Sequence, residues 1–187
     1  MREDIKLTDF PFLNVYRVVD PDKHIKNYTY SERKGKDSIA FICYDPKRDQ
    51  YLLNDEFKPP VDRFVLGAFG GSIDKNKSHK AITIEELKEE AGYDVEGVDV
   101  HSLGKVLVST QMNQYCYLFI AIVDESEFTG REPENAVEAM AKTQWVESKT
   151  LAMLNDWKAI TIYCKAVALG IVPATKYEFI PYTRINY

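Results

Sequence analysis

The sequence has few cysteines and no excess of basic residues, and each shortage argues against a class of protein. Among its 187 residues, three cysteines (Cys43, Cys116 and Cys164) stand alone in apolar runs, with neither a zinc-ligand nor a disulfide spacing. We expect all three to be buried free thiols in a reducing compartment. A formal net charge of −5 argues against a protein that coats nucleic acid.

Signals for membranes, secretion and multiple domains are also lacking. No apolar run approaches the ~20 residues of a membrane span. The opening Met-Arg-Glu-Asp has no apolar core of a signal peptide. We therefore expect a cytoplasmic protein with no membrane and no nucleic acid as partner. Since no linker or internal repeat is visible, a chain of 187 residues with 45% hydrophobic residues is predicted to form one domain.

The most informative stretch runs from residue 70 to residue 94, where a double glycine and a polar turn lead into a predicted helix. Ser78 is expected to cap the start of this helix, since its hydroxyl can accept from a free backbone N–H of the first turn. Gly92 is placed to end it in a left-handed conformation. Apolar residues at spacings of three and four predict one buried stripe: Ala81, Ile84, Leu87 and Ala91.

Three carboxylates gather on one side of this helix, at Glu86, Glu89 and Glu90. Like charges three or four residues apart cost a few tenths of a kcal/mol, roughly, in an isolated helix. A divalent cation reverses the sign of that cost, and carboxylate oxygens suit Mg²⁺ or Mn²⁺. The alternative is a solvated acidic face that Lys88 partly compensates.

The remaining pattern predicts an α/β (α+β) sandwich, a mixed sheet with helices on both faces. Two prolines in residues 56–60 are expected to stop a strand, and residues 31–37 are expected to form a charged turn. Residues 124–142 are expected to form a long mobile acidic loop with a helical turn. Residues 174–187 are expected to form an aromatic tail that packs on the domain or on a partner. The predicted strands are 10–19, 28–30, 38–44, 51–53, 64–69, 106–110, 115–123 and 143–146, and the predicted C-terminal helices are 148–154 and 155–169, ended by Gly170.

The helical stretch resembles the Nudix box, written G-x5-E-x7-R-E-U-x-E-E-x-G-U with U apolar. Gly71 matches the leading glycine, and the second half matches in register at Glu86, Leu87, Glu89, Glu90, Gly92 and Tyr93. Two positions depart, because Lys77 replaces the box glutamate and Glu85 replaces the box arginine. Either the two form an ion pair with exchanged signs, or Glu85 adds a fourth negative charge and the orienting role of the arginine is lost.

Membership of the Nudix family implies both a fold and a metal site. The implied fold is the Nudix α/β/α sandwich with a mixed sheet. The resemblance implies that Glu86, Glu89 and Glu90 bind Mg²⁺ or Mn²⁺ and that the Gly70 carbonyl is a further ligand. In the family, these metals activate water against a phosphoanhydride.

Outside the box, residues 12–170 are similar to the ADP-ribose and nucleotide-sugar pyrophosphatase branch. The matching runs are 53–60, 69–74, 113–121 and 156–160. Lys58 replaces the arginine of the first run, Gln114 replaces a glutamate of the third, and Thr110 replaces a proline. The resemblance implies that Lys58 and Gln114 contact the substrate.

A further catalytic glutamate in a loop is implied by the same branch. By its distance from Trp145, Glu138 matches best and Glu134 second. The alternative is that both are solvated loop acids.

The resemblance implies a single Nudix domain over residues 1–187. Residues 1–37 hold N-terminal strands that form a homodimer in the branch, residues 38–170 the Nudix core, and residues 171–187 the aromatic tail. Adenine stacking needs an aromatic side chain, for which the N-terminal segment offers Phe12, Tyr16, Tyr28 and Tyr30. The alternative is that these four aromatic residues belong to the core or to a dimer interface.

The expected activity is Mg²⁺-dependent hydrolysis of the pyrophosphate bond of a nucleoside diphosphate linked to another moiety, ADP-ribose or a nucleotide sugar. Two alternatives stay open. One is a non-catalytic nucleotide-sensing module, which the altered Lys77, Glu85 and Gln114 favour and the retained glutamates oppose. The other is a house-cleaning nucleoside triphosphate pyrophosphatase.

Overall fold

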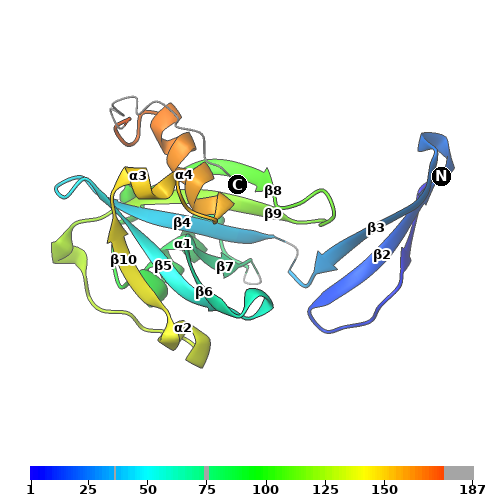
Figure 1. Ribbon diagram of the computed structural model, residues 1–187, viewed down its shortest axis with the longest axis horizontal. Helices are drawn as coiled ribbons and strands as arrows, with labels where there is room; N and C mark the ends of the chain where they lie inside the picture. Colours follow the sequence, from blue (N-terminus) through cyan, green and yellow to red (C-terminus); the bar gives the residue numbers. More distant parts are fainter. Residues whose placement is uncertain (36, 74–75, 175–187) are drawn as a thin grey trace, which may run out of the picture.

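The computed structural model describes residues 1–35, 37–73 and 76–174 of the chain. Residues 36, 74–75 and 175–187, which include nearly all of the expected aromatic tail, lie outside the described residues. The described chain forms a seven-stranded sheet with helices on both faces and a separate three-stranded sheet at the N-terminus (Figure 1).

The seven-stranded sheet is mixed. Its main path runs in the order β10-β5-β4-β9-β8, with β6 paired to β5 and β7 paired to β4. Only the β4–β9 pair is parallel among the strand pairs of the described residues, and the other pairs are antiparallel. The strands are β4 Ser38–Asp45, β5 Gln50–Lys58, β6 Arg63–Gly67, β7 Phe69–Ser72, β8 Val100–Leu107, β9 Tyr115–Ile122 and β10 Lys142–Val146.

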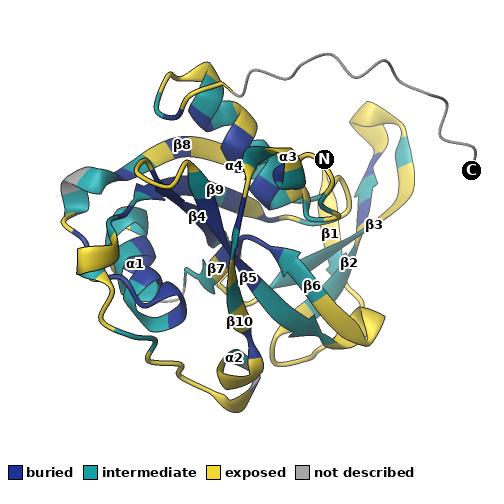
Figure 2. Cartoon of the chain, turned by 60° about the vertical axis from the view of Figure 1, so that its left-hand side comes forward, coloured by how far each residue is buried: buried dark blue, intermediate teal, exposed yellow. Residues whose placement is uncertain are grey.

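Strand β4 lies at the centre and is buried on both faces (Figure 2). Successive side chains of a strand point to opposite faces. Accordingly Ile39, Phe41 and Cys43 pack in the core beneath helix α1 (His79–Glu86), whereas Ala40 and Ile42 pack in the core beneath helix α4 (Trp157–Ala168). The predicted sandwich with a mixed sheet is therefore confirmed.

Helix α1 has the caps that the sequence predicts. The Ser78 hydroxyl accepts a hydrogen bond from the Ala81 N–H at 3.2 Å, and Gly92 adopts a left-handed φ of 82°. Between them, the helix ends in a π-helical turn, Leu87–Ala91. The predicted apolar stripe is only partly right: Leu87 and Ala91 are buried, but Ile82, rather than Ala81, faces the sheet.

The other helices are α2 Ala136–Met140 and α3 Ser148–Leu151, together with single 3-10 turns at Pro21–Lys23, Pro59–Val61, Gly97–Asp99 and Glu125–Glu127. Helix α4 begins at Asp156, whose carboxylate accepts from the Ala159 N–H at 2.8 Å. Within the described residues, no helix is long and apolar enough to cross a membrane.

All three cysteines are free thiols, as predicted, but they are not all buried. Cys43 and Cys116 are buried in the sheet, whereas Cys164 is exposed. The prediction was wrong for Cys164 because α4 is amphipathic, and an apolar run in sequence places every third or fourth residue on its solvent side.

Several strands differ in length from their predictions. Strand β5 extends beyond the predicted 51–53 to Lys58, because β6 pairs with its second half, and it ends directly before the two prolines that were predicted to stop it. The predicted strand 64–69 is divided between β6 and β7. Strand β3 (Ile25–Arg33) includes the start of the predicted charged turn, since β2 (Leu13–Asp20) pairs with it as far as Arg33.

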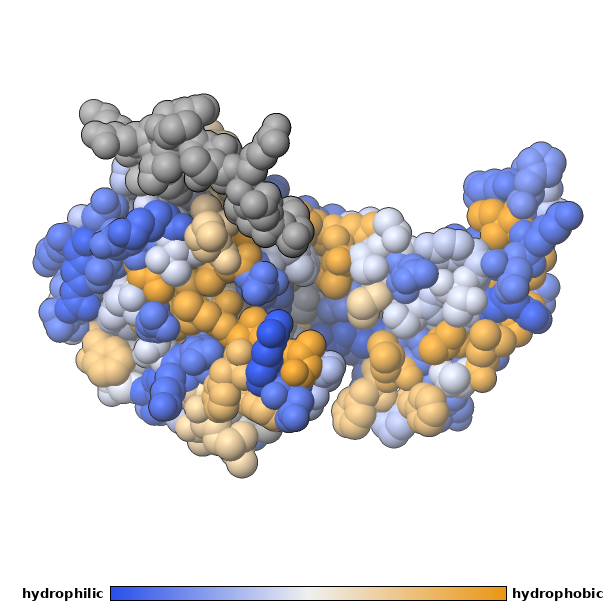
Figure 3. All heavy atoms as spheres, viewed as in Figure 1, coloured by the Kyte–Doolittle hydropathy of each residue, from blue (hydrophilic) through white to orange (hydrophobic). Residues whose placement is uncertain are grey.

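Strands β1 (Glu3–Lys6), β2 and β3 form the N-terminal sheet, which projects from the core as an arm (Figure 1). The arm meets the core at the loop after β8. There the Ser31 N–H donates to the Gln111 carbonyl at 2.8 Å, and the Tyr28 hydroxyl donates to the Thr110 carbonyl at 2.6 Å. Apolar side chains are visible on its surface (Figure 3), and Leu7, Phe10 and Phe12 are exposed.

Candidate active site

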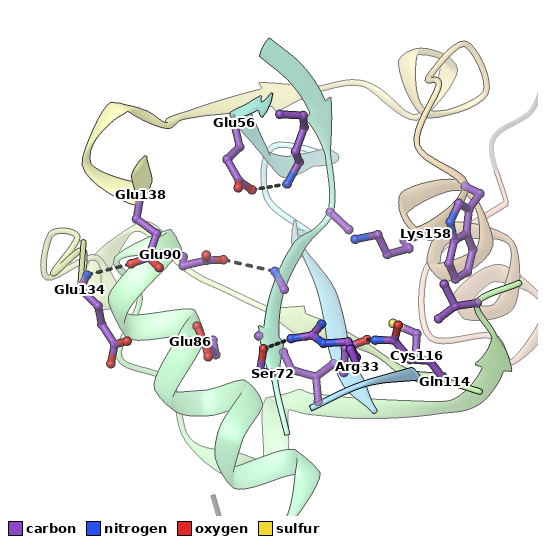
Figure 4. A pocket seen from close by; sticks show the side chains of 18 of the residues that line it. Arg33, Glu56, Ser72, Glu86, Glu90, Gln114, Cys116, Glu134, Glu138 and Lys158 are labelled. Atoms are coloured by element: carbon purple, nitrogen blue, oxygen red, sulfur yellow. Dashed lines mark hydrogen bonds and ion pairs between the residues drawn. The ribbon is translucent and has the colours of Figure 1, made fainter. Parts of the chain in front are cut away.

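A cavity of about 690 Å³ opens where the arm, the central sheet, α1, the acidic loop and the start of α4 meet (Figure 4). Its lining carries both signs of charge. The acidic residues are Glu56, Glu86, Glu90, Glu134 and Glu138. The basic residues are Arg33, Lys58 and Lys158. In Figure 4, Glu86, Glu90, Glu134 and Glu138 lie on one side and Lys158 on the other.

Glu90 is the most deeply placed of the acids, with 5% of its surface exposed. The Gly70 N–H donates to its Oε2 at 3.2 Å. Burial and the neighbouring Glu86 carboxylate raise the pKa of Glu90 to about 8, against the smaller lowering effect of the Gly70 hydrogen bond. A positive charge at this position would relieve both effects.

Strand β7 approaches α1 closely at Gly71. A Cβ atom added to Gly71 would overlap the Glu86 carboxylate. The leading glycine of the box thus makes room for Glu86 to face the cavity.

Several cavity residues are held by hydrogen bonds and ion pairs. Arg33 Nη2 of β3 donates to the Ser72 hydroxyl of β7 at 2.5 Å, and within β5 Lys58 Nζ lies 2.5 Å from Glu56 Oε2. Gln114 Nε2 donates to the Ser38 hydroxyl at 3.3 Å. The residues expected to contact substrate at positions 58 and 114 therefore line the cavity.

The two acids of the loop also line the cavity. The Glu138 carboxylate accepts from the Glu134 N–H at 2.8 Å and from the Asn135 side-chain amide, and the Glu138 N–H donates to Asn135 Oδ1 at 3.0 Å. These bonds fix the start of the short helix α2. In Figure 4, Glu138 lies beside Glu90.

Two residues expected at the site lie outside the cavity lining. The Glu89 side chain is half-buried, and its carbonyl accepts from the Glu132 N–H at 2.9 Å. Tyr28 is on the arm, where its hydroxyl is bonded to Thr110.

Several lining residues were missed by sequence reasoning, among them Arg33, Trp157 and Lys158. Arg33 was assigned to a turn, and Trp157 and Lys158 to the start of a helix. Trp157 and Lys158 lie within the run 156–160 that is similar to the pyrophosphatase branch, whereas Arg33 lies in none of the matching runs.

The acidic side fits a hard divalent cation in the chemistry of its donors, since carboxylate oxygens are the ligands that Mg²⁺ and Mn²⁺ prefer. Within residues 1–35, 37–73 and 76–174, no three His, Cys, Asp or Glu side chains are close enough together to hold a metal ion. The carboxylates would therefore have to draw together around an ion, which the repulsion between Glu86 and Glu90 opposes in its absence.

Comparisons with known proteins agree with this arrangement. No protein-family model matches the chain. An uncharacterized Nudix hydrolase of Schizosaccharomyces pombe is 22% identical over 94% of this chain and 90% of that protein. An ADP-ribose pyrophosphatase of Saccharomyces cerevisiae is 35% identical over 63 residues, which are 32% of this chain and 27% of that protein. The crystal structure of an ADP compounds hydrolase matches the fold with a TM-score of 0.66 at 17% identity, covering 91% of this chain and 95% of that one.

The box, the fold and these relatives agree, and the chain is similar to Nudix hydrolases over most of its length. It is a hydrolase.

Proposed function

We propose that this chain is a Nudix hydrolase of the ADP-ribose pyrophosphatase branch. It cleaves the pyrophosphate bond of a nucleoside diphosphate linked to another moiety, ADP-ribose or a nucleotide sugar, with Mg²⁺ or Mn²⁺. The observation that carries the proposal is the cavity with carboxylates and cationic side chains in one lining. A diphosphate with its metal ions presents charges of both signs, so it is complementary to such a lining. The name of the Saccharomyces cerevisiae relative, ADP-ribose pyrophosphatase, supports this class of substrate.

The metal ligands in this proposal are Glu86, Glu89 and Glu90 with the Gly70 carbonyl. A bound divalent cation supplies neutralisation of the diphosphate and a lower pKa for a water molecule. Arg33, Lys58 and Lys158 bind the phosphate oxygens, because their ammonium and guanidinium groups line the same cavity.

Glu138 is the proposed general base. The water oxygen attacks one phosphorus, the P–O bond to the bridging oxygen breaks, and the second phosphate leaves with that oxygen. The Glu138 carboxylate takes the proton of the attacking water. Hydrogen bonds from the Glu134 N–H and the Asn135 side-chain amide hold this carboxylate at the cavity.

A stacking surface for the nucleobase is proposed at Trp157. Trp157 is the only aromatic residue among the described residues that line the cavity, and it is 38% exposed. An indole face provides base stacking that is worth about 1–3 kcal/mol. Tyr28, on the arm, is the second candidate.

The chain is further proposed to be a single domain that forms a homodimer in the cytoplasm. The exposed apolar residues of the arm, Leu7, Phe10 and Phe12, support an interface over residues 1–37. Three free thiols support a reducing compartment.

A panel of nucleotides incubated with Mg²⁺ or Mn²⁺, with products identified by mass, tests the activity. We expect ADP-ribose to give AMP and ribose 5-phosphate, and Glu86→Gln to abolish this turnover. Binding without turnover would instead indicate the nucleotide-sensing module. Turnover of nucleoside triphosphates alone would indicate the house-cleaning pyrophosphatase.

A further inference from the structure

Arg131 joins the acidic loop to the end of the box helix. Its Nε donates to the Glu90 carbonyl at 2.5 Å, its Nη1 to the Ala141 carbonyl at 2.6 Å and its Nη2 to the Glu138 carbonyl at 2.9 Å. One guanidinium therefore binds the backbone of the proposed metal ligand Glu90 and the backbone of the proposed base Glu138.

The chain on the N-terminal side of Arg131 is bound to the same helix end by backbone hydrogen bonds. The Thr129 N–H donates to the Gly92 carbonyl at 2.8 Å, and the Asp94 N–H donates to the Glu127 carbonyl at 3.1 Å. The rings of Tyr93 and Phe128 pack edge-on with centroids 5.3 Å apart. These contacts fix the first part of the loop against the end of the box helix, and the hydrogen bonds of Arg131 fix α2 to the same helix end.

The three acceptors need an arginine at this position. Two of them, the Glu138 and Ala141 carbonyls, lie at the end of the short helix α2, and the Glu90 carbonyl lies in the last turn of the box helix. Carbonyls at helix C-termini carry partial negative charge. The Glu138 carbonyl also accepts from the Ala141 N–H at 3.1 Å, so Arg131 reaches it as a second donor. A guanidinium offers five donors in a fixed plane, whereas a lysine ammonium is a point charge that cannot span three acceptors in the same way.

We propose that Arg131 is a positioning residue, which sets the distance between the Glu138 carboxylate and the carboxylates of Glu86 and Glu90. The proposal rests on the proposed function, in which Glu138 takes the proton. Helix α2 has only five residues, Ala136–Met140, so it contributes little stability of its own and depends on this anchor. Arg131 itself does not line the cavity, and it acts through the backbone of Glu138.

The expected effect of Arg131→Lys is a fall in kcat of about ten- to a hundredfold with an unchanged KM. A misplacement of about 1 Å of a catalytic group costs up to ~10²-fold in rate. KM is expected to be unchanged in Arg131→Lys, because the proposed substrate contacts at Arg33, Lys58 and Lys158 are unaffected. Arg48→Lys is the matched control, since Arg48 also binds the acidic loop, through Glu125 at 2.6 Å, but lies outside the cavity lining.

The decisive experiment is a double-mutant cycle of Arg131→Lys with Glu138→Gln, read as kcat. If Arg131 acts through Glu138, the lysine variant costs nothing more once the glutamine is present. Additive losses would overturn the positioning role and leave the proposed function intact. An unchanged kcat in Glu138→Gln alone would overturn the assignment of the base and the positioning role together.

Hydrogen exchange without metal supplies a readout independent of activity. We expect Arg131→Lys to speed exchange of the amides of residues 138–141 while leaving residues 82–87 of α1 unchanged. Equal exchange in wild type and variant would show that Arg131 does not hold α2, and the inference would fail whatever the kinetics.

Discussion

Lys77 and Glu85 form an ion pair beside the first turns of α1. These are the two positions at which the sequence departs from the Nudix box, and the side chains that replace the box residues contact each other. Their exposed fractions are 48% and 31%, so the pair is partly screened by water. Exposed pairs of this kind contribute about 0.2–1 kcal/mol.

Reversal of this pair is the first prediction. Glu85→Arg alone places two cations together and is expected to lower the free energy of unfolding by an amount of the order of 1 kcal/mol. The double change Lys77→Glu with Glu85→Arg is expected to restore it. Urea unfolding of the two single variants and the double variant gives the coupling energy, and a coupling near zero would show that the pair has no energetic role.

The metal site gives the second prediction. Glu86→Gln is expected to lower kcat by at least about a hundredfold and to weaken Mn²⁺ binding, because it removes one charge of the ligand set. Mn²⁺ should raise the melting temperature of the wild type and raise that of the variant much less. Glu89→Gln is expected to behave alike. Glu96→Gln, an exposed acid elsewhere on the surface, is the control and should match the wild type. Full activity of Glu86→Gln would remove the box helix from the mechanism.

Trp157 gives the third prediction. A bound nucleobase should quench its fluorescence, and AMP titrated with Mg²⁺ present should therefore lower the emission of the wild type. Trp157→Leu should remove the quenching and raise KM about tenfold or more, in the range of a lost base stack, with kcat little changed. Trp157→Phe should keep most of the affinity. Trp145, on β10 and outside the cavity lining, is the internal reference, and quenching that persists in Trp157→Leu would refute the stacking role.

Asp124 gives the fourth prediction, on pH. Hydrogen bonds from the Lys47 ammonium, the Ser126 N–H at 3.0 Å and the Ser126 hydroxyl lower the pKa of Asp124 to about 2. A lowered pKa means that the stabilisation is fully present above the unfolded pKa of about 4 and is lost as the pH falls toward 2. The stability difference between wild type and Asp124→Asn should therefore be constant at pH 5–7 and shrink below pH 4. A difference that grows in acid would contradict it.

Local signals predicted the box helix well, and non-local contacts account for what was missed. Ser78 and Gly92 act on backbone groups a few residues away, so the sequence reveals both caps. The acceptors of Arg131 are backbone carbonyls, which leave no residue pattern at all. Arg33 and Trp157 meet at the cavity only because distant elements pack together.

The length of β5 was underestimated for a related reason. Residues 54–58 carry acids and a lysine, which are weak strand formers in isolation. Pairing with β6 satisfies their backbone and makes them strand. The parallel pairing of β4 with β9 likewise has no local signal.

The cavity takes its walls from Arg33 near one end of the chain to Lys158 near the other. During synthesis, a ribosome-bound chain therefore carries the box helix long before the rest of the site exists. Strand β4 completes its pairing only after β9 has been synthesised, because Ile39 of β4 lies opposite Tyr117 of β9. Such distant pairing forms slowly, because a long loop must close first. A nascent chain thus presents Glu86 and Glu90 before the cavity that they line together with Lys158 has formed.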